Sequence, residues 1–298
     1  MTASVDPQAV SWRDLEVLLG LLRARTAREA GERLGVDRTT VTRHVAALER
    51  RLGTALFVRT RDGLQPTAAA ERLRPAAERM EREAATIAQL ARSGAGEIAG
   101  NVRLATTEAL ASLLVAEGLL SLRDAHPQLT IELLGGNRPL DLRAGEADLA
   151  LRVVPSREAT LKVRCIARLG VGLFAAPSYL AQRGQPRGLS LAGHNVVLPS
   201  GELARSPEAA WLGASKGRVV FRSSSMPALF EAVAAGVGIG LFTLPWGGRD
   251  PRMQLLSAVE ALGRRGVWLV APSEGSSRRE VRLVGDRVAA IMRRVSGR

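Results

Sequence analysis

The sequence predicts a multidomain protein with an all-helical N-terminal region, a long linker helix and a larger α/β region. Three observations lead to this prediction. Apolar residues recur at helical spacing through the first 92 or so residues, which contain no convincing strand of alternating pattern. From about Asn101 onward, short runs rich in Val, Leu and Ile alternate with helix-like stretches, as in α/β folds with largely parallel sheets. Between the two regions, a charged helical stretch leads into a break rich in glycine and small residues at 93–100.

The amino-acid composition limits the kinds of protein that this chain can be. The chain has 298 residues, of which 46% are hydrophobic, and it carries a net charge of +13, which favours a polyanionic partner. It contains no apolar run long enough to span a membrane and no signal-peptide pattern, so we expect a cytoplasmic protein without a membrane partner. The single cysteine, Cys165, excludes a disulfide framework, and we expect it to be buried in a strand. With only three scattered histidines, we expect no metal site and no cofactor.

The first helix of a helix-turn-helix, expected at about residues 27–46, shows a face of small residues. Ala27, Ala30 and Gly31 would let a second helix cross closely over the first. Gly35 can adopt the positive φ that ends this helix, and Asp37 can cap the next one.

The second helix has an apolar stripe for its own domain and a different, exposed face. Within LGVDRTTVTRHVAALERRLG, the stripe consists of residues at steps of four, three and four: Val41, Val45, Leu48 and Leu52. The other face presents arginines and short hydroxyls, residue types that can contact base edges and phosphates in a major groove. The predicted groove contacts are Arg38, Thr39, Thr42 and Arg43.

The next segment, ALFVRTRDGLQPT, predicts a short hairpin or wing with Asp62 and Gly63 at its tip. Arg59 and Arg61 flank the tip and are expected to contact phosphate or the minor groove. The segment from Arg23 to Arg61 contains ten arginines and four acidic residues, which gives it a net charge of +6. These features together favour DNA binding over the alternative interpretation, a solvated amphipathic helix pair.

The linker segment predicts a dimerising helix. Thr67 is its expected N-cap, and apolar residues recur every three or four positions at Leu73, Ala76, Met80, Ala84, Ile87 and Ala91. Pro75 lies inside it and predicts a kink or a restart, because proline removes one hydrogen bond and clashes with the preceding turn. A solvated connector helix that pairs with nothing is the alternative.

The α/β region predicts strands at 102–106, 129–135, 147–153, 171–177, 195–199, 218–222, 238–243 and 266–272, with helix-like stretches at 110–125 and 226–235. In open parallel sheets, ligands bind beyond the carboxyl ends of the strands. The residues predicted to contact a ligand there are Thr106, Thr107, Glu108, Asn137, Arg152, Ser200, Ser223, Ser224 and Thr243. Such hydroxyls with an arginine suit a small carboxylate or another polar effector, although Glu108 argues against a bare anion pocket unless it pairs with Arg152. Taken singly, each residue is equally well explained as an N-cap or a loop residue.

Residues from Trp12 to about Leu73 resemble the winged helix-turn-helix of LysR-type transcriptional regulators, through AGERLGV, LERRLG, LFVRT, DG and QPT. The start of the second helix, DRTTVT, departs from the family pattern at Arg38 and Thr39, so the base preference stays open. HPQLTIEL, GEADLALRV, AAGVGIGLF and VWLVAP follow in the order seen in the effector-binding region of that family, which is of periplasmic-binding-protein type.

The resemblance implies a winged helix-turn-helix domain at 10–67, a linker and dimerisation helix at 68–95 and an effector-binding domain at 96–298. Within the last, it implies subdomain I at about 101–168 and 268–298 and subdomain II at about 169–267, with the effector between them. The apolar stripe of the C-terminal helix, Val281, Val284, Val288, Ile291 and Val295, is expected to dock on subdomain I.

The leading hypothesis is therefore a sequence-specific, effector-responsive DNA-binding transcription regulator. A homodimer or homotetramer would bind double-stranded DNA at an operator with dyad symmetry, with RNA polymerase as a further partner. The alternatives are a small-molecule binding protein whose N-terminal segment only serves assembly, and an enzyme built on the α/β half. Against an enzyme, the sequence lacks a nucleophile elbow, a phosphate loop and metal-ligand spacing.

Overall fold

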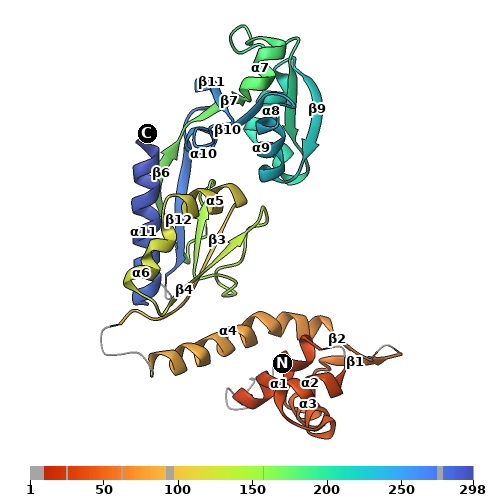
Figure 1. The fold of residues 1–298 in the computed structure, drawn as a ribbon. Coiled ribbons are helices and arrows are strands. Elements are labelled where there is room, and N and C mark those ends of the chain that lie inside the picture. The colour runs from red at the N-terminus through yellow and green to blue at the C-terminus, as the bar shows by residue number, and fades with distance from the viewer. Residues whose placement is uncertain are drawn as a thin grey trace. The chain divides into compact units, whose positions relative to one another are not determined.

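The structure is a computed structural model that describes residues 10–24, 26–61, 63–91, 97–156, 158–273 and 278–297. The chain divides into two compact units: the N-terminal region to residue 95 together with 143–146, and the remainder. Figure 1 shows the elements of both units. Asp62 and the first half of the glycine-rich break predicted at 93–100, residues 93–96, lie outside the described residues.

The N-terminal unit contains the predicted helix-turn-helix and wing. Its elements are α1 (Trp12–Leu22), α2 (Ala27–Leu34), α3 (Arg38–Leu52), β1 (Phe57–Thr60), β2 (Gly63–Pro66) and α4 (Ala68–Leu90). Gly35 ends α2 with φ +66°, and Asp37 accepts a hydrogen bond from the Thr40 amide at 2.8 Å, which confirms both predicted caps. β1 and β2 pair antiparallel and project from the helices where α4 begins (Figure 1).

The linker helix α4 is one continuous helix, so the predicted restart at Pro75 is wrong. Thr67 caps it as expected, because its hydroxyl accepts from the Ala70 amide at 3.3 Å. Ala70 and Ala77, on either side of Pro75, are buried in a cluster with Leu18 and Leu19 of α1. This packing holds both flanking turns and compensates for the hydrogen bond that proline lacks. The alternative expectation, a kink, stays a prediction.

One half of the second unit is a five-stranded sheet with strand order β4-β3-β5-β12-β6. The strands are β3 (Gly100–Thr106), β4 (Leu129–Gly135), β5 (Leu149–Arg152), β6 (Leu161–Leu169) and β12 (Arg265–Pro272). The helices are α5 (Glu108–Ala116), η2 (Leu119–Ser121), α6 (Leu122–Ala125) and α11 (Arg279–Ser296). The single helix predicted at 110–125 is therefore wrong: Gly118 takes φ +86° and interrupts it.

The other half has two small sheets. β10 (Gly240–Thr243), β7 (Val171–Ala175) and β11 (Gln254–Ala258) form an antiparallel sheet, and β8 (Asn195–Pro199) pairs parallel with β9 (Arg218–Ser223). Its helices are α7 (Pro177–Arg183), η3 (Gly201–Arg205), α8 (Pro207–Ala214), α9 (Met226–Ala234), α10 (Leu244–Gly247) and η4 (Glu260–Leu262).

The prediction of largely parallel sheets is wrong. In the five-stranded sheet the pairs β3–β4 and β3–β5 are parallel, whereas β12 runs antiparallel to both of its neighbours, β5 and β6. The difference comes from two long strands that cross between the halves: β6 leads directly into β7, and β12 returns from the second half at Arg265. A strand that returns directly next to the one that left must pair antiparallel with it.

The C-terminal helix α11 lies along the five-stranded sheet (Figure 1). All five residues of its predicted stripe are buried in a cluster that also contains residues of β3, β5, β6, β12 and α5. The expectation that this helix docks on the first half of the α/β unit is confirmed.

The expectation that Cys165 is buried is wrong, because its side chain is exposed. The register of β6 against β12 shifts between Val267 and Trp268, whose partners are Ala167 and Cys165. This bulge leaves Ile166 without an opposite residue and breaks the alternation of the strand, so Arg164 and Cys165 both face solvent.

Replacing Gly285 of α11 with alanine is expected to raise the stability of the α/β unit by up to about 1 kcal/mol. Gly285 has no positive φ, and a Cβ there would meet Leu269 and Leu149 at ordinary distances of 3.5 and 3.6 Å. Urea denaturation measures the change. The control is Gly172→Ala, whose Cβ would lie 2.6 Å from Leu255 and 3.1 Å from the Ser257 carbonyl, and which should lose stability. A Gly285→Ala protein less stable than wild type would contradict the packing described.

Candidate nucleic-acid interface and effector cleft

Helix α3 presents one face outward, and this face contains every groove contact predicted on the helix. Val41, Val45 and Leu48 are buried against α1 and α2, whereas Arg38, Thr39, Thr42 and Arg43 are exposed. Two further residues continue the exposed face, Ala46 and Arg50. Arg50 is absent from the residues predicted from sequence, although its position seven residues after Arg43 places it two turns along the same face.

Arginines of the N-terminal unit fall into two groups. Several are ion-paired with acidic residues of the unit, namely Arg13, Arg23, Arg28, Arg33, Arg51 and Arg74. By contrast, the arginines of the α3 face and the wing have no side-chain partner among the described residues: Arg38, Arg43, Arg50, Arg59 and Arg61. Arg72 on α4 shares this property. The guanidinium groups of the exposed α3 face and of the wing are thus available to an external anion.

Thr42 is partly committed to its own helix. Its hydroxyl donates to the Arg38 carbonyl at 2.9 Å, one turn earlier. The hydroxyl oxygen can still accept a hydrogen bond, and the methyl group remains for apolar contact, for example with a thymine methyl. Thr42 therefore offers a groove an acceptor and a methyl group.

A buried carboxylate in α1 fixes the orientation of α3. Asp14 has a side chain that is 4% exposed, pairs with Arg51 of α3 at 2.5 Å and lies 3.6 Å from His44 Nδ1. It also accepts hydrogen bonds from the Ser11 amide and hydroxyl, completing a capping box at the start of α1. Burial acts to raise the pKa of Asp14, but the hydrogen bonds from Ser11 and Arg51 outweigh it and lower the pKa below its usual value.

The N-terminal unit is expected to lose stability in acid through Asp14. Because the pKa is lowered in the folded state, the charged form stabilises the fold above the unfolded value of 3.8. This contribution is lost as the pH falls below 3.8 and through the folded pKa. Asp14→Asn should reduce stability at pH 7 by about 1–2 kcal/mol and flatten the acid limb, measured by thermal denaturation across pH. Unchanged acid sensitivity in the variant would show that Asp14 is not responsible.

The wing is held to the end of α3 by Glu49. Its carboxylate accepts from the backbone amides of Leu56 and Phe57, at 2.7 and 3.1 Å, so β1 starts at a fixed place. Arg59 and Arg61 are exposed near the hairpin tip, where Thr60 pairs with Gly63. The exposed arginines of α3 and of the wing therefore belong to one small domain.

Some of the predicted effector-binding residues meet where the two halves of the α/β unit face each other. The Asn137 side-chain amide donates to the Ser224 carbonyl at 3.0 Å, and Ser225 donates to Glu108 at 3.5 Å. Ser200 and Ser223, at the ends of β8 and β9, are joined by a backbone hydrogen bond of 2.8 Å. Four serines gather here and are called the serine cluster: Ser200, Ser223, Ser224 and Ser225. Glu108, Asn137 and the serine cluster thus line the boundary between the halves.

The other predicted effector-binding residues have local roles or make no described contact with this group. Thr107 caps α5 by accepting from the Leu110 amide at 3.4 Å, the alternative role foreseen for it. Glu108 and Arg152 form no ion pair among the described residues, and Arg152 donates instead to the Leu140 carbonyl at 2.9 Å, so Glu108 still argues against a bare anion pocket. Thr243 ends β10 and makes no described hydrogen bond to the other candidates. Thr106 is 7% exposed, and its hydroxyl has no hydrogen-bond partner among the described residues.

Glu117 links the two halves and was not predicted. This buried carboxylate, just after α5, pairs with Arg294 of α11 at 2.9 Å and with Arg249, which follows α10 in the other half. No local sequence pattern indicates this contact, because the arginines lie far away in the chain. Among the described residues, no group of three or more His, Cys, Asp or Glu side chains could hold a metal ion.

The two units match two family descriptions. Residues 12–71 match "Bacterial regulatory helix-turn-helix protein, lysR family", and residues 95–293 match "LysR substrate binding domain". Among solved structures, full-length CbnR in complex with its target DNA has a TM-score of 0.68 at 19% identity, covering 96% of this chain and 100% of CbnR. CrgA from Neisseria meningitidis has a TM-score of 0.56 at 21% identity, covering 95% and 99% of the two chains. These likenesses show a shared fold.

Relatives in sequence include three bacterial regulators. An HTH-type transcriptional regulator of Xanthomonas campestris is 35% identical over 161 residues, which span 53% of this chain and 46% of the relative. The Mau operon transcriptional activator of Paracoccus denitrificans is 30% identical over 182 residues, 59% of this chain and 64% of the relative. BbuR of Bordetella bronchiseptica is 28% identical over 293 residues, 95% and 90% of the two chains. The chain thus spans about half of the first relative and less than two thirds of the second.

A winged helix-turn-helix unit and a two-part α/β unit define the class of DNA-binding regulators that carry an effector domain. The chain belongs to the LysR family, since the match to the LysR substrate-binding domain covers well over half of it. It carries the regulatory helix-turn-helix domain of that family together with its substrate-binding domain.

Proposed function

We propose that α3 and the wing bind an operator with dyad symmetry, through Arg38, Thr39, Thr42, Arg43, Arg59 and Arg61, and that a small effector in the α/β unit modulates this activity. The observation that supports the DNA contacts most strongly is the division of the arginines. Six guanidinium groups elsewhere in the unit have carboxylate partners, whereas those of the α3 face and the wing have none among the described residues. The neighbour CbnR was solved with its target DNA, which is consistent with this proposal.

We propose that Arg38 and Arg43 contact bases and that Arg59 and Arg61 contact phosphates. Arginine binds the O6 and N7 edge of guanine with two hydrogen bonds, and the start of a recognition helix is the part that reaches the bases. The wing arginines would position the domain on the backbone without selecting a sequence.

We propose that α4 forms a homodimer, which pairs further into a homotetramer. Of its predicted stripe, Ala76, Met80 and Ile87 are exposed, with Met80 47% and Ile87 68% accessible. A second copy of the helix would cover these side chains. Two-fold symmetry then places two recognition helices on an inverted repeat. The proposed boundaries are 10–67 for the DNA-binding domain, 68–95 for the linker and 96–298 for the effector domain.

The proposed effector lies between the two halves of the α/β unit, subdomain I at about 101–168 with 268–298 and subdomain II at about 169–267. The buried hydroxyl of Thr106, with no described partner, and the serine cluster support this location. We propose that the effector is a small carboxylate. It would be bound by the side-chain amide of Asn137 and by Ser200, Ser223 and Ser224, once the hydrogen bond between Asn137 and Ser224 opens. Thr107, Glu108, Arg152 and Thr243 stay candidates for its further contacts.

We further propose a cytoplasmic location and RNA polymerase as a partner, because a transcription regulator acts where DNA is transcribed. The described part of the chain includes no helix that is long and apolar enough to cross a membrane.

A DNA shift assay of the full chain on its own upstream region, at several salt concentrations, tests the DNA contacts. We expect the logarithm of the binding constant to fall linearly with the logarithm of the salt concentration. Arg59→Ala should weaken binding to operator and random DNA equally and reduce the slope by about one per bound copy. Absence of binding to any DNA would favour the alternative, a small-molecule binding protein whose N-terminal unit only serves assembly.

A further inference from the structure

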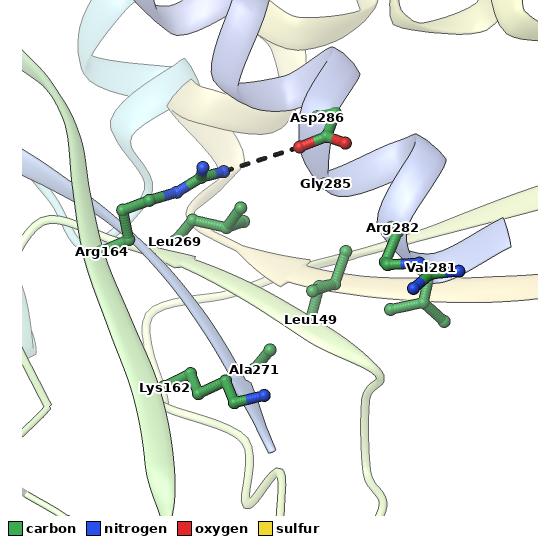
Figure 2. A pocket seen from close by; sticks show the side chains of 9 residues that line it. All are labelled: Leu149, Lys162, Arg164, Leu269, Ala271, Val281, Arg282, Gly285 and Asp286. Atoms are coloured by element: carbon green, nitrogen blue, oxygen red, sulfur yellow. Dashed lines mark ion pairs between the residues drawn. The ribbon is translucent and has the colours of Figure 1, made fainter. Parts of the chain in front are cut away.

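A cavity lies between α11 and the five-stranded sheet, away from the boundary between the two halves. Its volume is about 280 Å³. Figure 2 shows its lining: Leu149, Leu269 and Ala271 come from β5 and β12, Lys162 and Arg164 from β6, and Val281, Arg282, Gly285 and Asp286 from α11. None of these residues belongs to the proposed effector cleft.

The cavity exists because small residues face each other across a packed interface. Gly285 points no side chain at the sheet, and Ala271 offers only a methyl group. Gly285 has no steric reason to be glycine, because its φ is not positive and a Cβ would make only ordinary contacts of 3.5 and 3.6 Å. Glycine inside a helix costs stability relative to alanine. Its presence is therefore explained by the open space it leaves rather than by the backbone.

The lining divides into an apolar floor and a cationic mouth. Leu149, Leu269, Ala271 and Val281 are buried, whereas Lys162, Arg164, Arg282 and Asp286 are exposed. Three cations against one carboxylate leave the mouth positive. Arg164 reaches toward Asp286 with a separation of 3.8 Å, as the dashed line in Figure 2 marks. Arg282 has no side-chain partner among the described residues.

We propose that this cavity binds a small amphipathic carboxylate, with its apolar body against Leu149, Leu269 and Val281 and its carboxylate at Arg282. An apolar pocket with a few polar groups at its mouth is the usual form of a small-ligand site, and this volume admits a single ring or a short chain. The carboxylate would form charge-assisted hydrogen bonds with the Arg282 guanidinium. The ligand would bridge α11 and the sheet, and the site is separate from the proposed effector cleft.

Isothermal titration of the full chain with benzoate, 3-phenylpropanoate and hexanoate tests the proposal. At least one of these probes should bind wild type, while benzamide, which lacks the charge, should bind at least tenfold more weakly than benzoate. Arg282→Gln should weaken binding of the carboxylate roughly tenfold or more, because it removes a charge-assisted hydrogen bond. Gly285→Leu should abolish binding by filling the cavity.

Two controls separate this site from general charge effects and from the cleft. Arg279→Gln removes an exposed arginine of the same helix that does not line the cavity, and Ser225→Ala alters the cleft. Both variants should bind the probes like wild type. The proposal is overturned if none of the three carboxylates binds wild type, if Arg282→Gln binds them unchanged, or if Ser225→Ala abolishes binding. Arg282 is exposed, so its variant is expected to fold even if Gly285→Leu does not.

Discussion

Replacing Arg43 with alanine is expected to remove the preference of the protein for its operator over random DNA. A bidentate contact between arginine and guanine contributes about 1–3 kcal/mol of discrimination, so the ratio of operator affinity to random-DNA affinity should fall roughly five- to 150-fold. Arg43 is exposed on the α3 face and has no described partner within the chain. The fold and the oligomeric state should therefore stay unchanged. Fluorescence anisotropy with a selected operator and a scrambled duplex, at one salt concentration, measures the ratio.

The matched control for Arg43→Ala is Arg28→Ala. Arg28 lies on α2 in the same domain and pairs with Glu32 at 3.0 Å, so its removal changes the net charge equally. It should weaken DNA binding slightly through the general charge and leave discrimination intact. If Arg43→Ala retains the wild-type ratio, or if both variants lose it equally, Arg43 does not read the bases.

Replacing Gly31 with alanine is expected to destabilise the N-terminal unit by about 3 kcal/mol, near the upper end of ordinary overpacking. A Cβ at Gly31 would lie 2.5 Å from the carbonyl oxygen of Val36, in the turn between α2 and α3. This oxygen belongs to the backbone and cannot rotate away. The turn must open, and α3 would lose its support on α2, so DNA affinity should fall together with the stability of the unit.

Thermal denaturation followed by circular dichroism measures the effect of Gly31→Ala. Gly213→Ala in α8 is the control, because nothing lies within 4 Å of its added Cβ. There the higher helix propensity of alanine should appear as a small gain in stability. A Gly31→Ala protein as stable as wild type would show that α2 and the turn do not approach as closely as described.

The helix-turn-helix could be predicted because its determinants are local. The stripe of Val41, Val45 and Leu48 reports helical periodicity, and caps such as Gly35 and Asp37 act within one turn of their position. The same periodicity predicted which residues of α3 form its exposed face. Arg50 was missed although the same periodicity places it on that face.

The contacts that orient these local elements could not be predicted. Asp14 and Arg51 meet only once α1 and α3 have packed, and Glu117 meets Arg249 across the two halves of the α/β unit. The exposure of Cys165 depends on a bulge in the register of β6. Short apolar runs also do not reveal strand direction, which is why mixed sheets were mistaken for parallel ones.

Among the effector candidates, residue type did not resolve individual roles. Thr107 is a helix cap, whereas Asn137 contacts Ser224 in the other half. Both have the same appearance in sequence, a polar residue after a strand. Only the packing of the two halves distinguishes them.

The most direct test of DNA binding by the N-terminal unit compares the full chain with a chain that lacks residues 1–66, on the same upstream duplex at low salt. Circular dichroism of both proteins first verifies that the α/β unit remains folded. We predict that the full chain shifts the duplex and that the shortened chain does not bind it at any concentration tested. Binding of the shortened chain with undiminished affinity would contradict the proposal that α3 and the wing contact DNA.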